Sequence, residues 1–444
     1  MIIKKIFSLI FILLIIAGII LGIKVCIREN NVNIKRSEIL KDAFADISDV
    51  ELEINKLYTY GKGINLSGVA ENINKDNFEN VKLVVRDGND YEKSYNLDYE
   101  LDKENKKLYF STNNNMNTGI VIDELQDGEY FLFIRIKTNN SINPKYYSIK
   151  KSSDFFDGEI DYYTVTDENG NRKAEFNFDK YNVNNKELSF LSLSVKTAEL
   201  PEDIYDIVID AGHGGNDPGE MKDGVSESKL MLEYAELLED KLVEAGYKVL
   251  LTRNSDNTGT YTTTNMYDDG GRIIVANESK AKLMISLHIN SDQTHTLRGV
   301  EVYSPPKSNL DFATKLAKNI QTDSLLEYSN NKSFKKAEGV YVRNFTDALI
   351  KVYEDKAKNG GYEPYDLTTD TAFLYTIREV GGIATNAYVD GRNKVYGDNE
   401  YYKSCQGIEC YQLELGYVAN DFGILQNDKE TIVEIIADTI IDEY

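Results

Sequence analysis

The sequence is poor in the residues that build disulfide frameworks and large aromatic surfaces. Its 444 residues include three cysteines, three histidines and no tryptophan. Three cysteines are too few for the disulfide framework that stabilises many small secreted domains. Because tryptophan is absent, any surface that stacks against a ligand must use other aromatic side chains, and the chain has 31 tyrosines.

Positive charge is also scarce. Lysine and arginine together number 50, whereas aspartate and glutamate number 73, so the formal net charge at pH 7 is −23. Such an excess of negative charge repels phosphate backbones, and nucleic acid is therefore not expected as a partner. The length suffices for about two or three domains.

One long apolar run lies near the N-terminus. It extends from Ile6 to Ile23 and follows two lysines. About 18 apolar residues suffice to cross a bilayer, whereas a cleaved signal peptide has a shorter apolar core and a small-residue cleavage site, which is not evident here. We therefore expect residues 1–25 to form an uncleaved transmembrane anchor, followed by a linker over residues 26–46.

Residues 47–198 carry the pattern of an all-β domain. The segment Gly128–Ile136 alternates apolar with other residues, as a half-buried strand does. The turn Glu168–Asn171 lies between Tyr162–Thr166 and Lys173–Phe178, which predicts a hairpin. Short strands at such intervals predict a sandwich of immunoglobulin-like type. The domain has no histidine, and its carboxylates are scattered among lysines, so we expect no chemistry there.

Three polar residues follow short apolar runs in the second half of the chain: His213, His288 and Glu414. A short apolar run bounded by a turn predicts a buried strand, and in open α/β sheets functional groups gather beyond the carboxyl ends of the strands. We therefore expect these side chains to converge on one edge of a sheet. The runs are residues 207–210, 283–287 and 411–413.

A fourth residue is expected at the same edge. The glycine-rich turn after His213 is followed by a helix pattern in which Ser226 is a good N-cap and Glu227 lies in the first turn. A helix that follows a strand starts at the edge where the strand ended. Two imidazoles and one carboxylate leave a fourth position open for water, which is typical of catalytic zinc sites. Glu414 then offers a carboxylate to accept a proton from that water.

The order of the motifs resembles the zinc-dependent N-acetylmuramoyl-L-alanine amidases that cleave bacterial peptidoglycan, of the type with a D-x-G-H-G-G turn. The resemblance covers residues 204–444, and six motifs occur in the expected order. They are Asp210–Gly215 with Asp217–Gly219, Gly224–Glu227, Leu251–Arg253, Arg272 with Ala276–Asn277, Ile285–Asn290, and Leu413–Tyr417 with Asn420. By resemblance, His213, Glu227 and His288 are the zinc ligands and Glu414 is the catalytic carboxylate.

The resemblance implies hydrolysis of the amide bond between N-acetylmuramic acid and L-alanine, with Zn²⁺ as cofactor and peptidoglycan as substrate. Two alternatives share the pattern: a catalytically silent amidase-like domain that binds peptidoglycan or an envelope partner, and a zinc peptidase acting on the stem peptide. Single residues also have simpler interpretations. Glu227 could be a first-turn glutamate favoured by the helix dipole, and Glu414 could form a structural salt bridge.

The same resemblance fixes the expected location. Peptidoglycan lies outside the membrane, so we expect a single-pass protein of the cell membrane with its catalytic domain on the extracytoplasmic side. The basic residues just after the span would by themselves favour the opposite orientation. The β domain is then either a spacer or a surface that binds an envelope protein. The basic residues are Lys24, Arg28, Lys35 and Arg36.

The expected fold is an α/β catalytic domain with a mostly parallel sheet between helices, preceded by the β-sandwich and the anchor. One departure from the family is the length of the segment between the strand Gly299–Tyr303 and the Glu414 strand, about a hundred residues, which is more than expected there. This segment is predicted to contain two helices (about 309–327 and 345–358), a strand (372–379) and an irregular excursion (380–408). We expect both ends of the excursion near the zinc edge, where it either binds substrate or packs as an inert insertion.

The remaining polar candidates have structural interpretations. Asp217 precedes Pro218 and is most simply a turn former. Arg253, Arg272 and Arg378 could bind substrate carboxylates, but arginines on helix surfaces and at strand ends usually have only structural partners. The tyrosines that could stack against substrate are Tyr341, Tyr375, Tyr388 and Tyr417.

Overall fold

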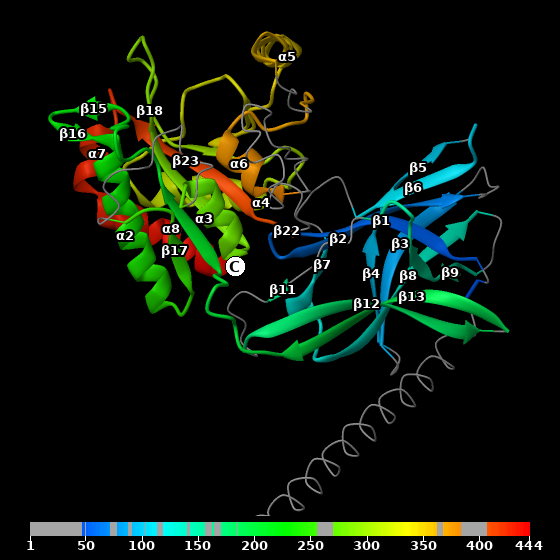
Figure 1. Ribbon diagram of the computed structural model, residues 1–444. Helices are drawn as coiled ribbons and strands as arrows, with labels where there is room; N and C mark the ends of the chain where they lie inside the picture. The colour runs from blue at the N-terminus through cyan, green and yellow to red at the C-terminus, as the bar shows by residue number, and fades with distance from the viewer. Residues whose placement is uncertain are drawn as a thin grey trace, which may run out of the picture.

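The computed structural model describes most of the chain after residue 46, and Figure 1 shows an all-β part and an α/β part. The predicted anchor (1–25) and linker (26–46) lie outside the described residues. Within the described residues, no helix is long and apolar enough to cross a membrane. The described residues are 47–444 without 49, 72–77, 88–90, 103, 113–118, 140–142, 156–161, 164–169, 184, 255–269, 362–366 and 383–405.

The N-terminal part consists of two β-sheets that share a hydrophobic core. One has the strand order β10-β1-β2-β6-β5, with β7 paired to β2, and the other has the order β11-β12-β13-β8-β3-β4, with β9 paired to β8. Leu57, Leu83 and Leu191, which come from both sheets, lie in one buried cluster. The strands are β1 (Leu52–Tyr60), β2 (Gly63–Glu71), β3 (Phe78–Arg86), β4 (Glu92–Asn96), β5 (Asp98–Asp102), β6 (Lys107–Ser111), β7 (Ile120–Val121), β8 (Gly128–Thr138), β9 (Lys145–Tyr147), β10 (Ile149–Lys151), β11 (Tyr162–Tyr163), β12 (Arg172–Val183) and β13 (Lys186–Thr197).

Two local predictions for this part can be compared with the structure. The two strands of the expected hairpin pair antiparallel, with Tyr162 of β11 opposite Ala174 of β12, while part of the turn between them lies outside the described residues. Strand β8 is buried on both faces rather than one: Leu132 packs in the shared core, while Phe131 packs in a second buried cluster. The immunoglobulin-like type of the sandwich stays a prediction.

The C-terminal part is a mixed seven-stranded sheet with helices on both faces (Figure 1). Its order is β17-β14-β18-β23-β19-β21-β20, parallel from β17 to β23 and antiparallel at β23–β19 and β21–β20. Helices α2, α4, α7 and α8 contribute to the core on one face, and α3 and α6 to the core on the other. The strands of this sheet are β14 (Ile207–Ala211), β17 (Val249–Leu251), β18 (Leu283–Asn290), β19 (Glu301–Tyr303), β20 (Lys335–Ala337), β21 (Val340–Tyr341) and β23 (Glu409–Tyr417). Strands β15 (Met221–Lys222) and β16 (Val225–Ser226) pair with each other, and β22 (Gln406–Gly407) pairs with β1. The helices are α2 (Glu227–Glu244), α3 (Arg272–Ser279), α4 (Asp311–Asp323), α5 (Asp347–Gly360), α6 (Tyr375–Val380), α7 (Phe422–Asn427) and α8 (Lys429–Glu443).

Helix α2 begins where the sequence predicted. Ser226 is its N-cap and its hydroxyl accepts a hydrogen bond from Lys229 N at 3.3 Å. Leu230, Tyr234 and Leu238 recur at helical spacing and are buried against the sheet. The two helices predicted in the long segment before the Glu414 strand are also present, as α4 and α5.

The strand predicted over residues 372–379 is wrong, because Tyr375–Val380 forms helix α6. Residues 376–380 are all buried, so they show no amphipathic period. Because Thr376, Arg378 and Glu379 are buried together with the apolar residues, polarity does not mark an exposed face here, and periodicity alone cannot distinguish a strand from a helix. Arg378 extends back to the chain before the helix and donates from Nη1 to Ala372 O at 3.0 Å.

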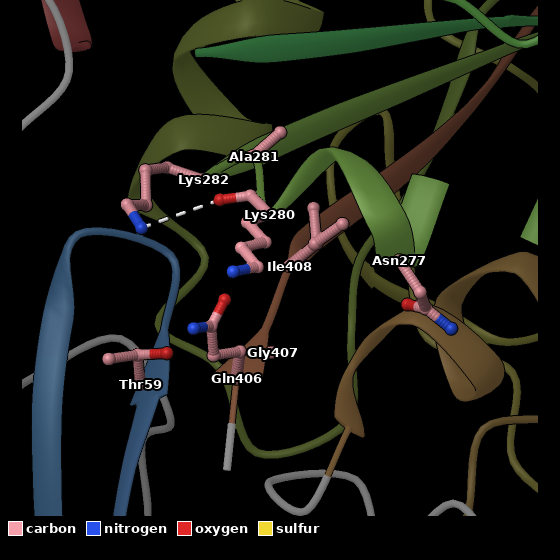
Figure 2. Close-up of a pocket in the computed structure, with 8 residues that line it drawn as sticks. All are labelled: Thr59, Asn277, Lys280, Ala281, Lys282, Gln406, Gly407 and Ile408. Carbon is pink, nitrogen blue, oxygen red and sulfur yellow. Dashed lines mark hydrogen bonds between the residues drawn. The ribbon is translucent and has the colours of Figure 1, made fainter. Parts of the chain in front are cut away.

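The two parts of the chain are joined by a short strand pairing. Strand β22 pairs in parallel with β1, with Thr59 opposite Gln406 and Tyr60 opposite Gly407. Gly61 N adds a hydrogen bond to Gly407 O at 3.0 Å. Figure 2 shows this joint, where Thr59, Gln406, Gly407, Ile408, Asn277, Lys280, Ala281 and Lys282 line a small pocket.

The excursion predicted to border the zinc edge starts and ends at this joint. Gly382 is so close to Gln406 that an added Cβ would lie 2.1 Å from Gln406 O. Ile408 N donates to Val380 O at 2.9 Å. Gln406 lies three residues before Glu409, the first residue of β23, whereas Glu414 is the sixth residue of that strand, about 17 Å beyond Glu409. The expectation that both ends lie near the zinc edge is therefore wrong.

Candidate metal centre

Two histidines and one glutamate meet at the carboxyl ends of β14 and β18. His213 lies in the turn after β14, Glu227 is the first residue of α2, and His288 is the sixth residue of β18. Glu227 Oε1 is 3.1 Å from His213 Nε2 and 3.3 Å from His288 Nδ1. One possible ligand atom from each residue lies within 4.8 Å of the others. The three residues singled out from the sequence are thus neighbours in space.

The turn after β14 needs glycine to bring its backbone close to these side chains. A Cβ on Gly212 would lie 2.5 Å from His288 Cε1, and one on Gly219 would lie 2.6 Å from Glu227 Oε2. His213 itself has a φ of +57°, in the left-handed region that L-residues rarely adopt. The turn therefore accepts local backbone strain in order to direct the imidazole toward Glu227.

Glu227 is held from both of its oxygens. Ile289 N donates to Oε1 at 2.8 Å and Glu220 N donates to Oε2 at 3.0 Å. Burial alone would raise the pKa of the carboxyl, but hydrogen bonds from His213 and His288 outweigh it and hold the pKa well below its usual range. A buried carboxylate that stays ionised and is held in place by these partners favours the binding of a cation.

Asp217 contributes more than the turn that the sequence predicted. Its Oδ1 accepts from Gly219 N at 3.1 Å, which is the expected turn, while its Oδ2 lies 2.9 Å from His213 Nδ1. Burial lowers the pKa of His213, but the carboxylates of Glu227 and Asp217 raise it to about 9. With Asp217 on Nδ1, the other ring nitrogen faces Glu227 and is directed toward a ligand position.

Glu414 lies on the strand next to the two histidines. The parallel register of β18 and β23 sets it directly opposite His288. Burial raises the pKa of the Glu414 carboxyl to about 7, although the neighbouring His288 lowers it. Gln412 Nε2 donates to Glu414 Oε1 at 2.8 Å. A carboxylate with a pKa near neutrality is suited to accept and return a proton.

A further carboxylate, Glu301, was not identified from the sequence. It lies opposite Glu414 on β19 and is completely buried. Tyr417 OH and Ser329 Oγ each donate to its Oε1 at 2.6 Å, and Tyr303 OH donates to its Oε2 at 2.9 Å. The available signal was a glutamate inside the otherwise apolar run Gly299–Tyr303.

Comparison with known proteins identifies the family. The family model for N-acetylmuramoyl-L-alanine amidase matches residues 207–354. The germination-specific N-acetylmuramoyl-L-alanine amidase of Bacillus subtilis is 32% identical over 169 residues, which cover 36% of this chain and 70% of that protein. This chain belongs to the N-acetylmuramoyl-L-alanine amidase family.

Two more comparisons cover a smaller share of the relative or have a lower sequence identity. The sporulation-specific N-acetylmuramoyl-L-alanine amidase of Bacillus subtilis is 38% identical over 87 residues, 19% of this amidase and 31% of that protein. The solved catalytic domain of CwlV, an N-acetylmuramoyl-L-alanine amidase from Bacillus (Paenibacillus) polymyxa, is 20% identical with a TM-score of 0.34, covering 54% of this chain and 97% of that one. The family match includes His213, Glu227 and His288 and ends before Glu414.

The donor set of this amidase suits a zinc ion. Catalytic zinc sites use three protein ligands of nitrogen or oxygen type and keep a fourth position open. Tetrahedral bonds of about 2.0–2.1 Å place neighbouring ligand atoms about 3.3 Å apart. The two separations at Glu227 Oε1 are 3.1 and 3.3 Å. The imidazoles are 25% and 13% exposed while Glu227 is 2% exposed, so the group opens to solvent on the histidine side.

The arginines near the site have structural partners, as the sequence predicted. Arg272 Nη1 donates to the completely buried Asp210 at 2.8 Å, and its Nη2 donates to His213 O at 2.6 Å. Arg253 donates from Nε to Ala211 O at 2.9 Å and from Nη2 to Gly212 O at 3.0 Å. Both guanidinium groups therefore hold the turn that carries His213 in place.

Two of the four tyrosines proposed as stacking surface belong to the core of the amidase. Tyr341 is completely buried and donates to Asn331 O at 3.0 Å, and Tyr417 is 1% exposed with its hydroxyl on Glu301. Tyr375 is partly exposed, and Tyr388 lies outside the described residues. The prediction of a stacking role is therefore wrong for Tyr341 and Tyr417.

Proposed function

We propose that this amidase hydrolyses the amide bond between N-acetylmuramic acid and L-alanine in bacterial peptidoglycan, with zinc held by His213, Glu227 and His288. The observation that carries the proposal is the position of Glu414, directly opposite His288 on the adjacent strand. It puts a carboxylate beside the ligand group, where a metal-assisted hydrolase needs a base. The family, whose members are generally zinc-dependent, supports the same chemistry.

Each residue has a separate task in this reaction. Zinc, when bound, acts as a Lewis acid on the scissile carbonyl and lowers the pKa of water. Glu414 accepts the proton of the attacking water and delivers it to the nitrogen of the leaving amine. Asp217 fixes the ring of His213, and Ile289 N and Glu220 N fix the carboxylate of Glu227.

The test uses the full chain, purified with zinc, and peptidoglycan sacculi as substrate. Mass spectrometry of the products should show free stem peptides that begin with L-alanine. Replacing Glu414 with glutamine should leave the zinc content intact and reduce turnover by a factor on the order of 100 or more. The matched control is Glu354→Gln on the exposed face of α5, which should keep the parental rate.

Other outcomes would identify the alternatives. Cleavage inside the stem peptide would make the protein a zinc peptidase. Binding to sacculi without any product, in a folded and zinc-loaded chain, would make it a silent domain. If Glu414→Gln turned over peptidoglycan at near the parental rate, Glu414 would be structural and the mechanism would be wrong.

We also propose a location for the enzyme. The apolar run Ile6–Ile23 supports a single-pass anchor in the cell membrane, with the catalytic domain facing the cell wall. The all-β part then lies between the anchor and the enzyme, as a spacer or as a surface for an envelope protein.

A further inference from the structure

The amide of Gln412 contacts the proposed base, Glu414. Side chains two residues apart on a strand share one face of the sheet, so Gln412 and Glu414 lie next to each other on β23. Gln412 is 7% exposed, and its Nε2 donates to Glu414 Oε1 at 2.8 Å. This contact involves one of the two carboxylate oxygens, Oε1.

The amide of Gln412 is itself oriented by helix α6. Thr376 is completely buried, and its hydroxyl donates to Gln412 Oε1 at 3.3 Å. A glutamine amide accepts at its oxygen and donates at its nitrogen, so a donor on the oxygen turns the NH₂ group toward Glu414. Helix α6 is fixed in turn, because Val380 O accepts from Ile408 N at 2.9 Å.

The position of Glu414 makes such a donor useful. Glu301 lies opposite it on β19, and Glu227 lies beside His288, which is opposite it on β18. The carboxylates of Glu301 and Glu227 repel the ionised carboxylate of Glu414. A neutral amide donor holds the ionised carboxylate in one orientation and adds no cation that would compete with the metal group.

We propose that Gln412, oriented by Thr376, is a positioning residue for Glu414. It holds Oε1 in place and thereby directs Oε2 to the attacking water. This inference rests on the proposed function, since it assigns Gln412 a task only if Glu414 is the base. A displacement of a catalytic group by about 1 Å can cost on the order of 100-fold in rate.

The first test is Gln412→Leu in the full chain, because leucine keeps most of the volume and removes the donor. We expect kcat to fall by a factor of about 10 or more, with KM, zinc content and folding unchanged. Thr376→Val should lower kcat in the same direction, and Thr376→Ser, which keeps the hydroxyl, should restore most of the rate. Gln426→Leu, at an exposed position on α7, is the matched control.

The second test repeats Gln412→Leu in the Glu414→Gln background. If Gln412 acts through Glu414, it should have no further effect on the residual rate there. An equal loss in both backgrounds would show a merely structural role, and an unchanged kcat in the single variant would also overturn the proposal. If Gln412→Leu fails to fold by circular dichroism, the Thr376→Val and Thr376→Ser pair decides. Failure of the proposed function is recognised separately, because Glu414→Gln would then match the parent.

Discussion

Replacing Asp217 with asparagine should weaken zinc binding without removing any proposed metal ligand. The carboxylate makes two contacts, one with Gly219 N at 3.1 Å and one with His213 Nδ1 at 2.9 Å. Asparagine has the same shape, but only one acceptor oxygen and an NH₂ donor. If the oxygen stays on Gly219, the NH₂ group faces His213 Nδ1 and favours the tautomer with its proton on Nε2, the nitrogen that faces Glu227. If the amide is reversed, the turn loses its acceptor.

The expected magnitude follows from this geometry. Replacing the partner of a metal-ligating histidine typically lowers metal affinity 10–100-fold, which is about 1.4–2.7 kcal/mol. We expect the upper half of this range, because the new donor opposes the ligating tautomer and does not merely leave it unsupported. The metal-free chain should lose only about 1 kcal/mol of unfolding free energy, the usual contribution of one hydrogen bond.

The assay is competition for zinc between the full chain and a chromogenic chelator, joined to urea denaturation of the metal-free protein. Asp292→Asn is the matched control, because Asp292 also accepts backbone hydrogen bonds in a turn, from Thr294 N at 3.1 Å and Thr296 N at 3.2 Å. Parental zinc affinity in Asp217→Asn would refute the positioning argument. An equal loss in Asp292→Asn would attribute the effect to overall charge instead.

Three further outcomes are expected. Replacing His213 or His288 with alanine should remove zinc from the full chain, and a variant that kept one zinc per chain would exclude that residue as a ligand. Replacing Glu409 with alanine should lower the free energy of unfolding by at least about 2 kcal/mol, because two tyrosine hydroxyls lose their buried acceptor and each such group costs roughly 1–3 kcal/mol. An unchanged urea midpoint would contradict that prediction. The full chain should fractionate with membranes through residues 1–25, whereas a soluble form that starts near residue 27 would identify a signal peptide.

The parts of the site that could be predicted from sequence depend on local signals. Short apolar runs located β14, β18 and β23, and the N-cap at Ser226 located the start of α2. Because parallel strands end at one edge, these elements were enough to bring His213, Glu227 and His288 together. Their assignment as zinc ligands came from the resemblance to the amidase family, because the spacing alone explains Glu227 equally well as a first-turn glutamate of the helix.

The residues that were missed depend on pairing between distant strands. Glu301 lies opposite Glu414 because β19 runs antiparallel to β23. The sequences of the two strands do not indicate whether they pair parallel or antiparallel. Thr376 was assigned to a strand, so its contact with Gln412 could not be predicted. The second contact of Asp217 depends on the left-handed backbone at His213, which the turn sequence permits but does not require.

The prediction that residues 380–408 begin and end near the zinc site failed because it ignored the length of strand β23. Sequence order places residues 380–408 just before the strand of Glu414, which suggests proximity to the site. A strand is nearly straight, however, so its first and sixth residues lie about 17 Å apart.

Strand β23 contacts the all-β part near its start and carries the proposed base, Glu414, further along. At its start, Glu409 accepts from Tyr444 OH at 2.5 Å and packs against Gly61 of the all-β part. Further along the strand, Glu414 lies opposite His288 of the proposed zinc ligands and is held in register between β18 and β19. A strand paired on both sides is a rigid support for a catalytic group. Changes at the joint should consequently act on the stability of the chain, while changes at Gln412 and Glu414 act on its chemistry.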